Sequence, residues 1–208
     1  SRRIKEIMKY KFVFLRHGRS LADDEHKHEG RYDSPLTKIG KQQAEFTAQK
    51  LKVYNFDLII TSPLKRALET AEIISRVIQR KIEINDLFKE RDNGILAGLL
   101  LEEAKVKYPE PKYKSIYQNF PEDSGENDKQ LNSRALQCIN SIFKRNPGNY
   151  LIVSHGTMLN AIIKQILKIP IGNTGASTFF RFKDNAYIEL EYHIEKDIWL
   201  FNRMENEL

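Results

Sequence analysis

Five side chains of this sequence could act together on a phosphoryl group. Arg16 and His17 stand side by side before a glycine, Arg66 follows a Ser-Pro pair, and His155 stands between a serine and a glycine. Glu90 adds a carboxyl group. An arginine presents a rigid fork of N–H donors that matches the oxygens of a phosphate. Two arginines and two histidines at one place therefore predict a site for phosphate or for a small phosphorylated molecule.

A histidine among arginines could also act as a nucleophile. A neutral imidazole can attack phosphorus, and neighbouring cations disfavour the protonated ring. The same cations stabilise charge on the equatorial oxygens of the group being transferred. The leaving alkoxide then needs a proton, which a carboxylic acid can supply. The residue types therefore indicate phosphoryl transfer, with Glu90 as the proton donor and other carboxyl groups as alternatives, namely Asp23, Asp92, Glu102 and Glu103.

Strand and helix signals alternate along the chain, and these elements must position the five side chains. Short apolar runs predict strands, and apolar residues three or four positions apart predict helices. The predicted strands are 11–16, 56–60, 82–84, 150–153, 178–182 and 187–192. The predicted helices are 37–51, capped by Thr37, one that begins at Pro63, one marked by Leu131, Ala135, Cys138 and Ile142, and one that follows Gly156.

This order predicts an α/β fold in which a mostly parallel sheet lies between two layers of helices. Three predicted strands end in the turns that hold Arg16-His17, Ser62-Pro63 and His155. Ligands of open α/β sheets lie beyond the carboxyl ends of the strands, so the topology predicts that these turns meet. Gly156 opens the next helix, whose first N–H groups favour an anion. Residues 98–130 break the rhythm, and we expect a short cap insertion over one edge of the sheet.

Length and composition limit the class of protein. The 208 residues include 40% hydrophobic and 30% charged side chains, which predicts one globular domain over residues 1–208 and excludes collagen-like and disulfide-rich chains. The net charge is +6, but residues 1–11 hold five basic and one acidic side chain, a net +4. Because most of the excess lies in this short extension, we expect no nucleic-acid partner. No apolar run approaches the roughly 18 residues of a membrane span.

The N-terminus and the cysteine content bear on the compartment. A single cysteine and the absence of an apolar signal segment favour a cytoplasmic protein. Residues 1–9 form a basic extension, and the sequence from Met8 resembles a natural beginning. We therefore expect residues 1–7 to be an added or disordered segment. The sequence leaves the oligomeric state open.

Six ordered blocks of the chain resemble the histidine phosphatase superfamily, the group that includes the phosphoglycerate mutases, over roughly residues 10–183. The blocks are FLRHGRS at 14–20, Gly30 with DSPLT at 33–37, TSPL at 61–64 with Arg66, Glu90-Arg91 with Gly94, Gly125-Glu126, and VSHG at 153–156. Six blocks in order are far more specific than one Arg-His-Gly tripeptide. The resemblance implies a phosphoglycerate mutase-like fold and a phosphorylated substrate. It implies no metal or organic cofactor, because arginines supply the positive charge.

The resemblance also implies a role for each residue. His17 would be the nucleophile that forms a phosphohistidine, and Glu90 would donate a proton and then activate water. Arg16, Arg66 and His155 would hold the phosphoryl group. The substrate-binding residues that it implies are Arg16, Ser20, Asp23, Gly30, Arg66, His155, Gly156 and Thr157. The acidic run at 23–29 is interpreted as a solvated loop near the mouth of the site, because Lys27 between its two histidines argues against a metal site.

Two other functions stay open at this point. Cofactor-dependent mutases of the family have a longer cap with an adjacent pair of arginines, whereas residues 98–130 contain lysines and no arginine. We therefore expect a phosphatase that acts on small phosphorylated metabolites with broad specificity, and keep a phosphoglycerate mutase as the alternative. A non-catalytic phosphate-binding scaffold is the alternative of another class. It would require a lost catalytic group, yet His17, Arg16, Arg66 and His155 are all present.

Overall fold

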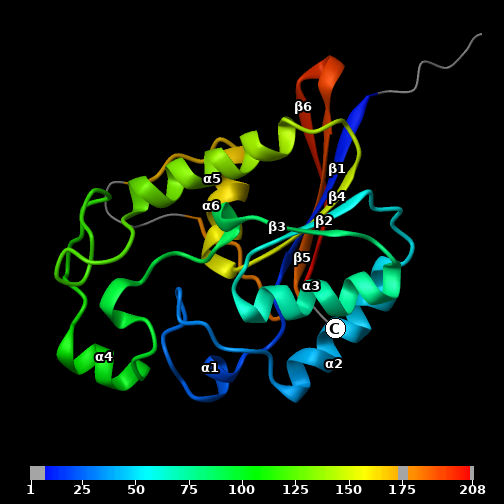
Figure 1. The fold of residues 1–208 in the computed structure, drawn as a ribbon. Helices are drawn as coiled ribbons and strands as arrows, with labels where there is room; N and C mark the ends of the chain where they lie inside the picture. The colour runs from blue at the N-terminus through cyan, green and yellow to red at the C-terminus, as the bar shows by residue number, and fades with distance from the viewer. Residues whose placement is uncertain (1–7, 173–177, 207–208) are drawn as a thin grey trace, which may run out of the picture.

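A six-stranded sheet runs through the part of the chain that the computed structural model describes, residues 8–172 and 178–206 (Figure 1). In spatial order the strands are β3 (Ile82–Ile84), β2 (Leu58–Thr61), β4 (Asn149–Ser154), β1 (Lys9–Arg16), β5 (Tyr187–His193) and β6 (Ile198–Glu205). β2, β4 and β1 are consecutive neighbours and run parallel, with β3 parallel to β2. β5 is antiparallel to β1, and β6 is antiparallel to β5. The mostly parallel sheet is therefore confirmed.

Two pairs of helices cover the two faces of the sheet (Figure 1). One pair is α2 (Lys38–Leu51) and α3 (Lys65–Ile78), and the other is α5 (Asp128–Phe143) and α6 (Gly156–Ile166). The short elements are α1 (Leu21–Asp24), α4 (Leu101–Lys107) and the 3₁₀ turns η1 (Asp86–Phe88), η2 (Gly94–Leu96) and η3 (Ile194–Lys196). This three-layer arrangement is the one that the alternating pattern predicts.

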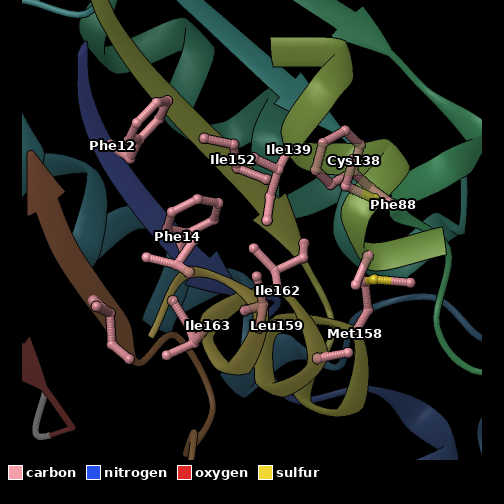
Figure 2. Packing of buried hydrophobic residues seen from close by; sticks show 14 of the residues in the cluster. Phe12, Phe14, Phe88, Cys138, Ile139, Ile152, Met158, Leu159, Ile162 and Ile163 are labelled. Atoms are coloured by element: carbon pink, nitrogen blue, oxygen red, sulfur yellow. The ribbon is translucent and has the colours of Figure 1, made fainter. Parts of the chain in front are cut away.

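Alternate residues of β1 explain why both faces need a helical layer. Phe12 and Phe14 belong to the cluster formed with α5 and α6, and Figure 2 shows Phe14 on the side of Ile162 and Ile163. Val13 and Leu15 belong to the opposite cluster, with residues of α2 and α3. A strand that buries side chains on both faces reads as a continuous apolar run. The run at 12–15 therefore forms a strand that is buried on both faces, and Arg16 and His17 stand at the end of this strand.

Cys138 lies on the buried face of α5, as its helical spacing predicts. Figure 2 places it beside Ile139 and Phe88. Burial raises the pKa of its thiol to about 12. A thiol that stays protonated at neutral pH is a poor nucleophile, so this cysteine contributes packing.

Most predicted elements are confirmed, with ends that differ by one or two residues. Thr37 caps α2 by accepting a hydrogen bond from the N–H of Gly40 at 2.9 Å. The strand expected at 178–182 is wrong. The peptide groups of this segment bond to side chains instead, because Asn160 bonds both the N–H and the carbonyl oxygen of Phe180, and Arg16 donates to the carbonyl oxygen of Phe182. The segment therefore lies against the site and not along a strand.

The cap at 98–130 contains α4 and is bonded to the loop at 26–28. Its expected place over one edge of the sheet stays a prediction. His28 donates its N–H to the carbonyl oxygen of Leu99 at 2.9 Å, and Leu101 donates to that of His26 at 2.8 Å. A backbone bridge also links Lys27 with Leu100. These backbone bonds hold α4 beside the mouth of the site, close to α1 (Figure 1).

The C-terminal strand β6 escaped prediction. Trp199 on this strand packs on Phe12 and Phe143, with ring centroids 5.5 and 5.9 Å away. Neighbouring apolar side chains such as Phe201 are half exposed, so the strand lacks the alternation of a half-buried strand.

In the described ranges no helix is both long and apolar enough to cross a bilayer. The expectation about residues 1–7 lies outside the described residues, and the single domain over 1–208 stays a prediction.

Candidate active site

The ends of three neighbouring strands bring the predicted groups together. Arg16 pairs with Ser154 in the register of β1 and β4, and Thr61 pairs with Val153 in that of β2 and β4. The residues that follow these positions are His17, Ser62 and His155. The rings of His17 and His155 lie 5.1 Å apart between centroids. The topology thus gathers the turns as the sequence predicts.

His17 is held as a neutral ring with one nitrogen directed at Arg66. Its side chain is 1% exposed. The Nδ1 atom lies 2.7 Å from the carbonyl oxygen of Gly18, which requires a proton on Nδ1, and Nε2 accepts from Nε of Arg66 at 3.2 Å. Burial, and then the charges of Arg66 and Arg16, hold the pKa of His17 well below its usual value. The free lone pair of this imidazole is therefore on Nε2.

Gly18 permits this arrangement because no side chain would fit there. A Cβ at this position would lie 2.6 Å from the carbonyl oxygen of Gly40 and 2.7 Å from Nδ2 of Asn185. The N–H of Gly18 donates to the hydroxyl of Thr70 on α3 at 3.1 Å. The turn after β1 is thus packed between α2 and α3, which fixes the backbone on which His17 stands.

Arg66 is the most deeply buried cation of the site, with an exposed fraction of 0%. It lies in the first turn of α3, and its three nitrogens each have a partner. Nη1 donates to the carbonyl oxygen of Tyr32 and Nη2 to that of Gly30, both at 2.8 Å, while Nε faces His17. Gly30 has a φ of +48°, which favours glycine and turns its carbonyl oxygen toward Arg66. The orientation of the guanidinium is therefore fixed by the loop at 30–32.

Arg16 stands at the solvent side of the same site, with 20% of its side chain exposed. Nη1 donates to the carbonyl oxygen of Phe182 at 2.8 Å. Nη2 lies 3.4 Å from Oδ1 of Asp184 and 3.9 Å from Oδ1 of Asp23. Asp23 also forms a capping box with Ser20 at the start of α1. Asp23 and Ser20 therefore lie at the site, where they bond to each other.

His155 directly follows β4 and forms the N-cap of α6. Its Nε2 lies 2.8 Å from the hydroxyl oxygen of Ser62. The Nδ1 atom is buried without a hydrogen-bond partner among the described residues. Burial, followed by the charges of Arg66 and His17, holds the pKa of His155 well below its usual value. A buried ring nitrogen without a partner is costly, and such atoms mark functional sites.

Glu90 lies against the start of α6. Its carboxylate accepts from the N–H groups of Thr157 at 3.1 Å and Met158 at 3.0 Å, and it is 9% exposed. Of the rival carboxyl groups, Glu102 and Glu103 are exposed on α4, and Asp92 pairs with Arg31. Glu90 lines a cavity of about 330 Å³ whose wall also includes Arg16, Asp23, Glu29, Gly30, Gly156 and Thr157.

Arg134 on α5 holds the segment that carries Glu90. Its guanidinium donates to the carbonyl oxygens of Leu87, Lys89 and Glu90, at 2.7, 2.7 and 3.2 Å. It also pairs with both carboxylate oxygens of Glu126, at 2.6 and 2.8 Å. Sequence reasoning placed Glu126 in a family block but missed Arg134. The buried position of Arg134 in the helical pattern of α5 is the signal that could have found it.

Glu29 is the second residue that sequence reasoning missed. The loop at 23–29 was expected to be solvated, yet the Glu29 side chain is only 17% exposed. Its Oε1 lies 3.2 Å from Nε of Arg66, and its Oε2 lies 3.8 Å from Nε2 of His17. Its place directly before Gly30, which opens the second block of the family resemblance, was the available signal.

Comparison with known proteins identifies the group to which this site belongs. The family model described as "Histidine phosphatase superfamily (branch 1)" matches residues 12–205. The uncharacterised phosphatase PhoE of Bacillus subtilis is 36% identical over 153 residues, 73% of this chain and 75% of its own length. A 2,3-bisphosphoglycerate-dependent phosphoglycerate mutase of Cytophaga hutchinsonii is 31% identical over 199 residues, 86% of this chain and 93% of its own.

Solved structures agree with the sequence relatives. The structure of YhfR from Bacillus stearothermophilus superposes with a TM-score of 0.82 at 25% identity, and covers 96% of this chain and 98% of its own. The match to the family model spans the candidate site residues from Arg16 to Thr157. This chain therefore belongs to the histidine phosphatase superfamily, branch 1, and is a phosphatase of that superfamily, a phosphomonoester hydrolase.

Proposed function

We propose that this enzyme hydrolyses small phosphorylated metabolites through a phosphohistidine formed on His17. The observation that carries the proposal is the state of that ring. The Gly18 carbonyl oxygen fixes the proton on Nδ1, and Nε2 presents its lone pair toward Arg66. A buried neutral imidazole beside a guanidinium combines a nucleophile with the cation that stabilises the transferred group.

In the first step Nε2 of His17 attacks the phosphorus, and the bond from phosphorus to the ester oxygen breaks. The leaving alkoxide takes a proton from Glu90, which must enter this step as the carboxylic acid. Arg16, Arg66 and His155 donate to the three equatorial oxygens. Arg66 transfers its Nε hydrogen bond from the imidazole to a phosphoryl oxygen as the new bond forms. The bonds of Nη1 and Nη2 to the carbonyl oxygens of Tyr32 and Gly30 hold the guanidinium in place, so the side chain of Arg66 need move little during this transfer.

In the second step water attacks the phosphohistidine from the side that the alcohol has left. Glu90, now a carboxylate, takes a proton from this water, the bond from phosphorus to nitrogen breaks, and the electron pair returns to Nε2 of His17. Inorganic phosphate leaves and the enzyme returns to its starting state. The cycle uses only groups of the chain, and the absence of a metal and of an organic cofactor stays a prediction.

The cavity of about 330 Å³ suits a small substrate with a polar organic part. Ser20, Asp23, Gly30, Gly156 and Thr157 are the residues that we propose for its substrate side. Asp23 and Thr157 line the cavity, whereas Ser20 acts through its bonds to neighbouring side chains. The carboxylates in the wall can accept hydrogen bonds from hydroxyl or amino groups of the organic part.

A phosphoglycerate mutase is the second candidate, because a mutase of Cytophaga hutchinsonii is 31% identical to this chain. A mutase must pass the phosphoryl group to a second acidic substrate before water arrives. The cap at 98–130 has lysines but no arginine to hold a second carboxylate. Incubation with 3-phosphoglycerate and a trace of 2,3-bisphosphoglycerate separates the two: hydrolysis predicts phosphate release, and isomerisation much faster than that release would favour the mutase.

The direct test of hydrolysis uses p-nitrophenyl phosphate and a panel of sugar and amino-acid phosphates. We expect turnover by the wild-type enzyme and none by His17→Ala. A scaffold without catalytic activity predicts that both proteins bind phosphate and neither releases p-nitrophenol. The values of kcat/KM across the panel then define the substrate class.

A further inference from the structure

The Glu29 carboxylate lies beside the groups that would hold a phosphoryl oxygen. Its Oε1 accepts from the Ser20 hydroxyl at 2.5 Å and forms an ion pair with Arg66, 3.2 Å from Nε. Its Oε2 lies 3.8 Å from Nε2 of His17, the nitrogen that would attack phosphorus. The protein's own carboxylate is therefore paired with the hydroxyl of Ser20 and the buried cation Arg66.

A carboxylate and a phosphoryl group compete for such donors, because both are anionic oxygen acceptors. The negative charges of the Glu29 carboxylate and of a phosphoryl group held by the same donors would repel each other strongly, because burial excludes water. Nη1 and Nη2 of Arg66 each donate to a carbonyl oxygen, that of Tyr32 and that of Gly30, which fixes the guanidinium with its Nε edge toward His17 and Glu29. The Glu29 carboxylate and a phosphoryl group would therefore compete for this edge of Arg66.

The surroundings of Glu29 allow its side chain to leave while its backbone stays in place. Its carbonyl oxygen accepts from the N–H of Tyr32 at 2.7 Å, and the N–H of the preceding His28 is bonded to the cap. The side chain lines the cavity of about 330 Å³, into which it can rotate. A change of side-chain torsion is therefore enough to free Arg66 and Ser20.

We propose that Glu29 is a built-in competitor for the phosphoryl position, and that every phosphate-bearing ligand must displace its carboxylate from Arg66 and Ser20. The proposal rests on the phosphoryl site of the proposed function. Its consequence is a displacement cost that lowers the affinity for every phosphate-bearing ligand by the same factor, and free inorganic phosphate has no organic part whose contacts offset this cost. The product thus leaves readily, while substrates with a well-fitting organic part still bind.

The test measures binding of inorganic phosphate by isothermal titration calorimetry, with orthovanadate as a second probe. We expect Glu29→Gln and Glu29→Ala each to tighten the Kd of phosphate by about tenfold or more, equivalent to about 1.4 kcal/mol. The matched control is Glu25→Gln, which removes the same charge from an exposed position of the same loop, where Glu25 pairs with Lys27. We expect a change of less than about twofold in this control.

Three results would overturn the proposal. One is an unchanged or weaker Kd in both Glu29 variants whose melting curves match that of the wild type. Another is tighter binding by Glu29→Gln alone, which would assign the gain to the new amide donor and not to removal of a competitor. The third is equal tightening by Glu25→Gln, which would assign it to net charge. Glu29→Asp, whose shorter side chain recedes from Arg66, should fall between wild type and Glu29→Gln.

Binding measured in this way does not depend on turnover. If the wild type binds phosphate but hydrolyses nothing, the proposed function fails and the Glu29 comparison can still be made. If turnover follows the proposed function and the Glu29 variants bind phosphate as the wild type does, only this inference fails. In kinetics we expect Glu29→Gln to raise inhibition by product phosphate, with a larger change in the inhibition constant than in kcat.

Discussion

Nε of Arg66 donates a hydrogen bond to Nε2 of His17 over 3.2 Å, and this contact joins the proposed nucleophile to the cation proposed to stabilise the phosphohistidine. Because Arg66 is the donor, Nε2 of His17 must be the acceptor, so the imidazole is neutral with its proton on Nδ1. The Gly18 carbonyl oxygen supplies the matching acceptor at 2.7 Å. The backbone of the turn after β1 thus selects the tautomer that can attack phosphorus.

His17→Ala should remove both turnover and phosphoenzyme formation. We expect the rate with p-nitrophenyl phosphate to fall by at least about 10³, because the covalent route is lost. Acid-labile ³²P labelling during turnover measures the intermediate directly. His26→Ala, at an exposed histidine of the neighbouring loop, is the control and should keep its label. A labelled His17→Ala protein would place the nucleophile elsewhere.

Arg66→Lys keeps the positive charge but loses the planar set of guanidinium N–H donors. A lysine cannot bond the carbonyl oxygens of Gly30 and Tyr32 while it also faces His17, so we expect kcat/KM to fall by about 10²–10³. Steady-state kinetics and phosphate binding measure the loss. Arg76→Lys on the exposed face of the same helix is the matched control. Equal activity of the two variants would show that charge alone suffices at position 66.

Glu90→Gln should affect poor leaving groups most. An amide cannot donate a proton to an alkoxide as a carboxylic acid does, so alkyl phosphates should slow by about 10²–10⁴ and p-nitrophenyl phosphate should slow less. The ratio of kcat values for the two substrate types is the measurement. Glu103→Gln on α4 changes an exposed carboxylate and should leave this ratio unchanged. An unchanged ratio in Glu90→Gln would move the acid role to another group.

The histidines make stability depend on pH in a predictable direction. The folded state holds the pKa values of His17 and His155 below their usual value, so the unfolded chain binds more protons as the pH falls below about 6.5. The free energy of unfolding should therefore be fully retained above this pH and decrease below it, by up to about 1.4 kcal/mol per pH unit for each ring. Urea unfolding at pH 7.5 and 5.0 measures the effect.

Variants assign this dependence to the two rings. His155→Asn should flatten the pH dependence of the unfolding free energy, and His26→Asn should leave it as in the wild type. His26 is exposed and has a φ of +54°, which asparagine tolerates. A dependence that survives in His155→Asn and His17→Asn alike would assign it to carboxyl groups.

Arg134→Met should destabilise the fold and misplace Glu90. The pair with Glu126 is nearly buried, with 12% and 10% of the two side chains exposed. Breaking one side of a buried pair costs about 3–5 kcal/mol, because the other charge is left without a partner. Lys129→Met, at an exposed position of α5, is the control. Chemical unfolding gives the stability, and a double-mutant cycle with Glu126→Gln gives the coupling between the two charges.

The sequence predicts the layers and the meeting of the turns well, because both follow from local patterns. The apolar run before Arg16 and the Ser-Pro pair before Arg66 each mark a strand end or a helix start. The segment at 178–182 could not be predicted in the same way. Its β-forming residues are bound by Asn160 and Arg16 from distant parts of the chain, which no local pattern records.

The role of Glu29 also lies beyond local pattern. A glutamate in a run of charged residues is typical of a solvated loop, and only the tertiary structure brings Arg66 and Ser20 to it. The same holds for Arg134, whose partners at Leu87, Lys89 and Glu90 are more than 40 positions away. The groups that do chemistry can be recognised from their own neighbours in sequence, whereas the groups that adjust them cannot.

The start of α6 has a mechanical consequence. His155 forms the N-cap of this helix, and the N–H groups of Thr157 and Met158 in its first turn hold the carboxylate of Glu90. One helix end thus positions both His155, a proposed ligand of the phosphoryl group, and Glu90, the proposed proton donor. A shift of α6 along its axis would displace His155 and Glu90 together. The packing that holds this helix in place therefore fixes both the anion site and the carboxyl group beside it.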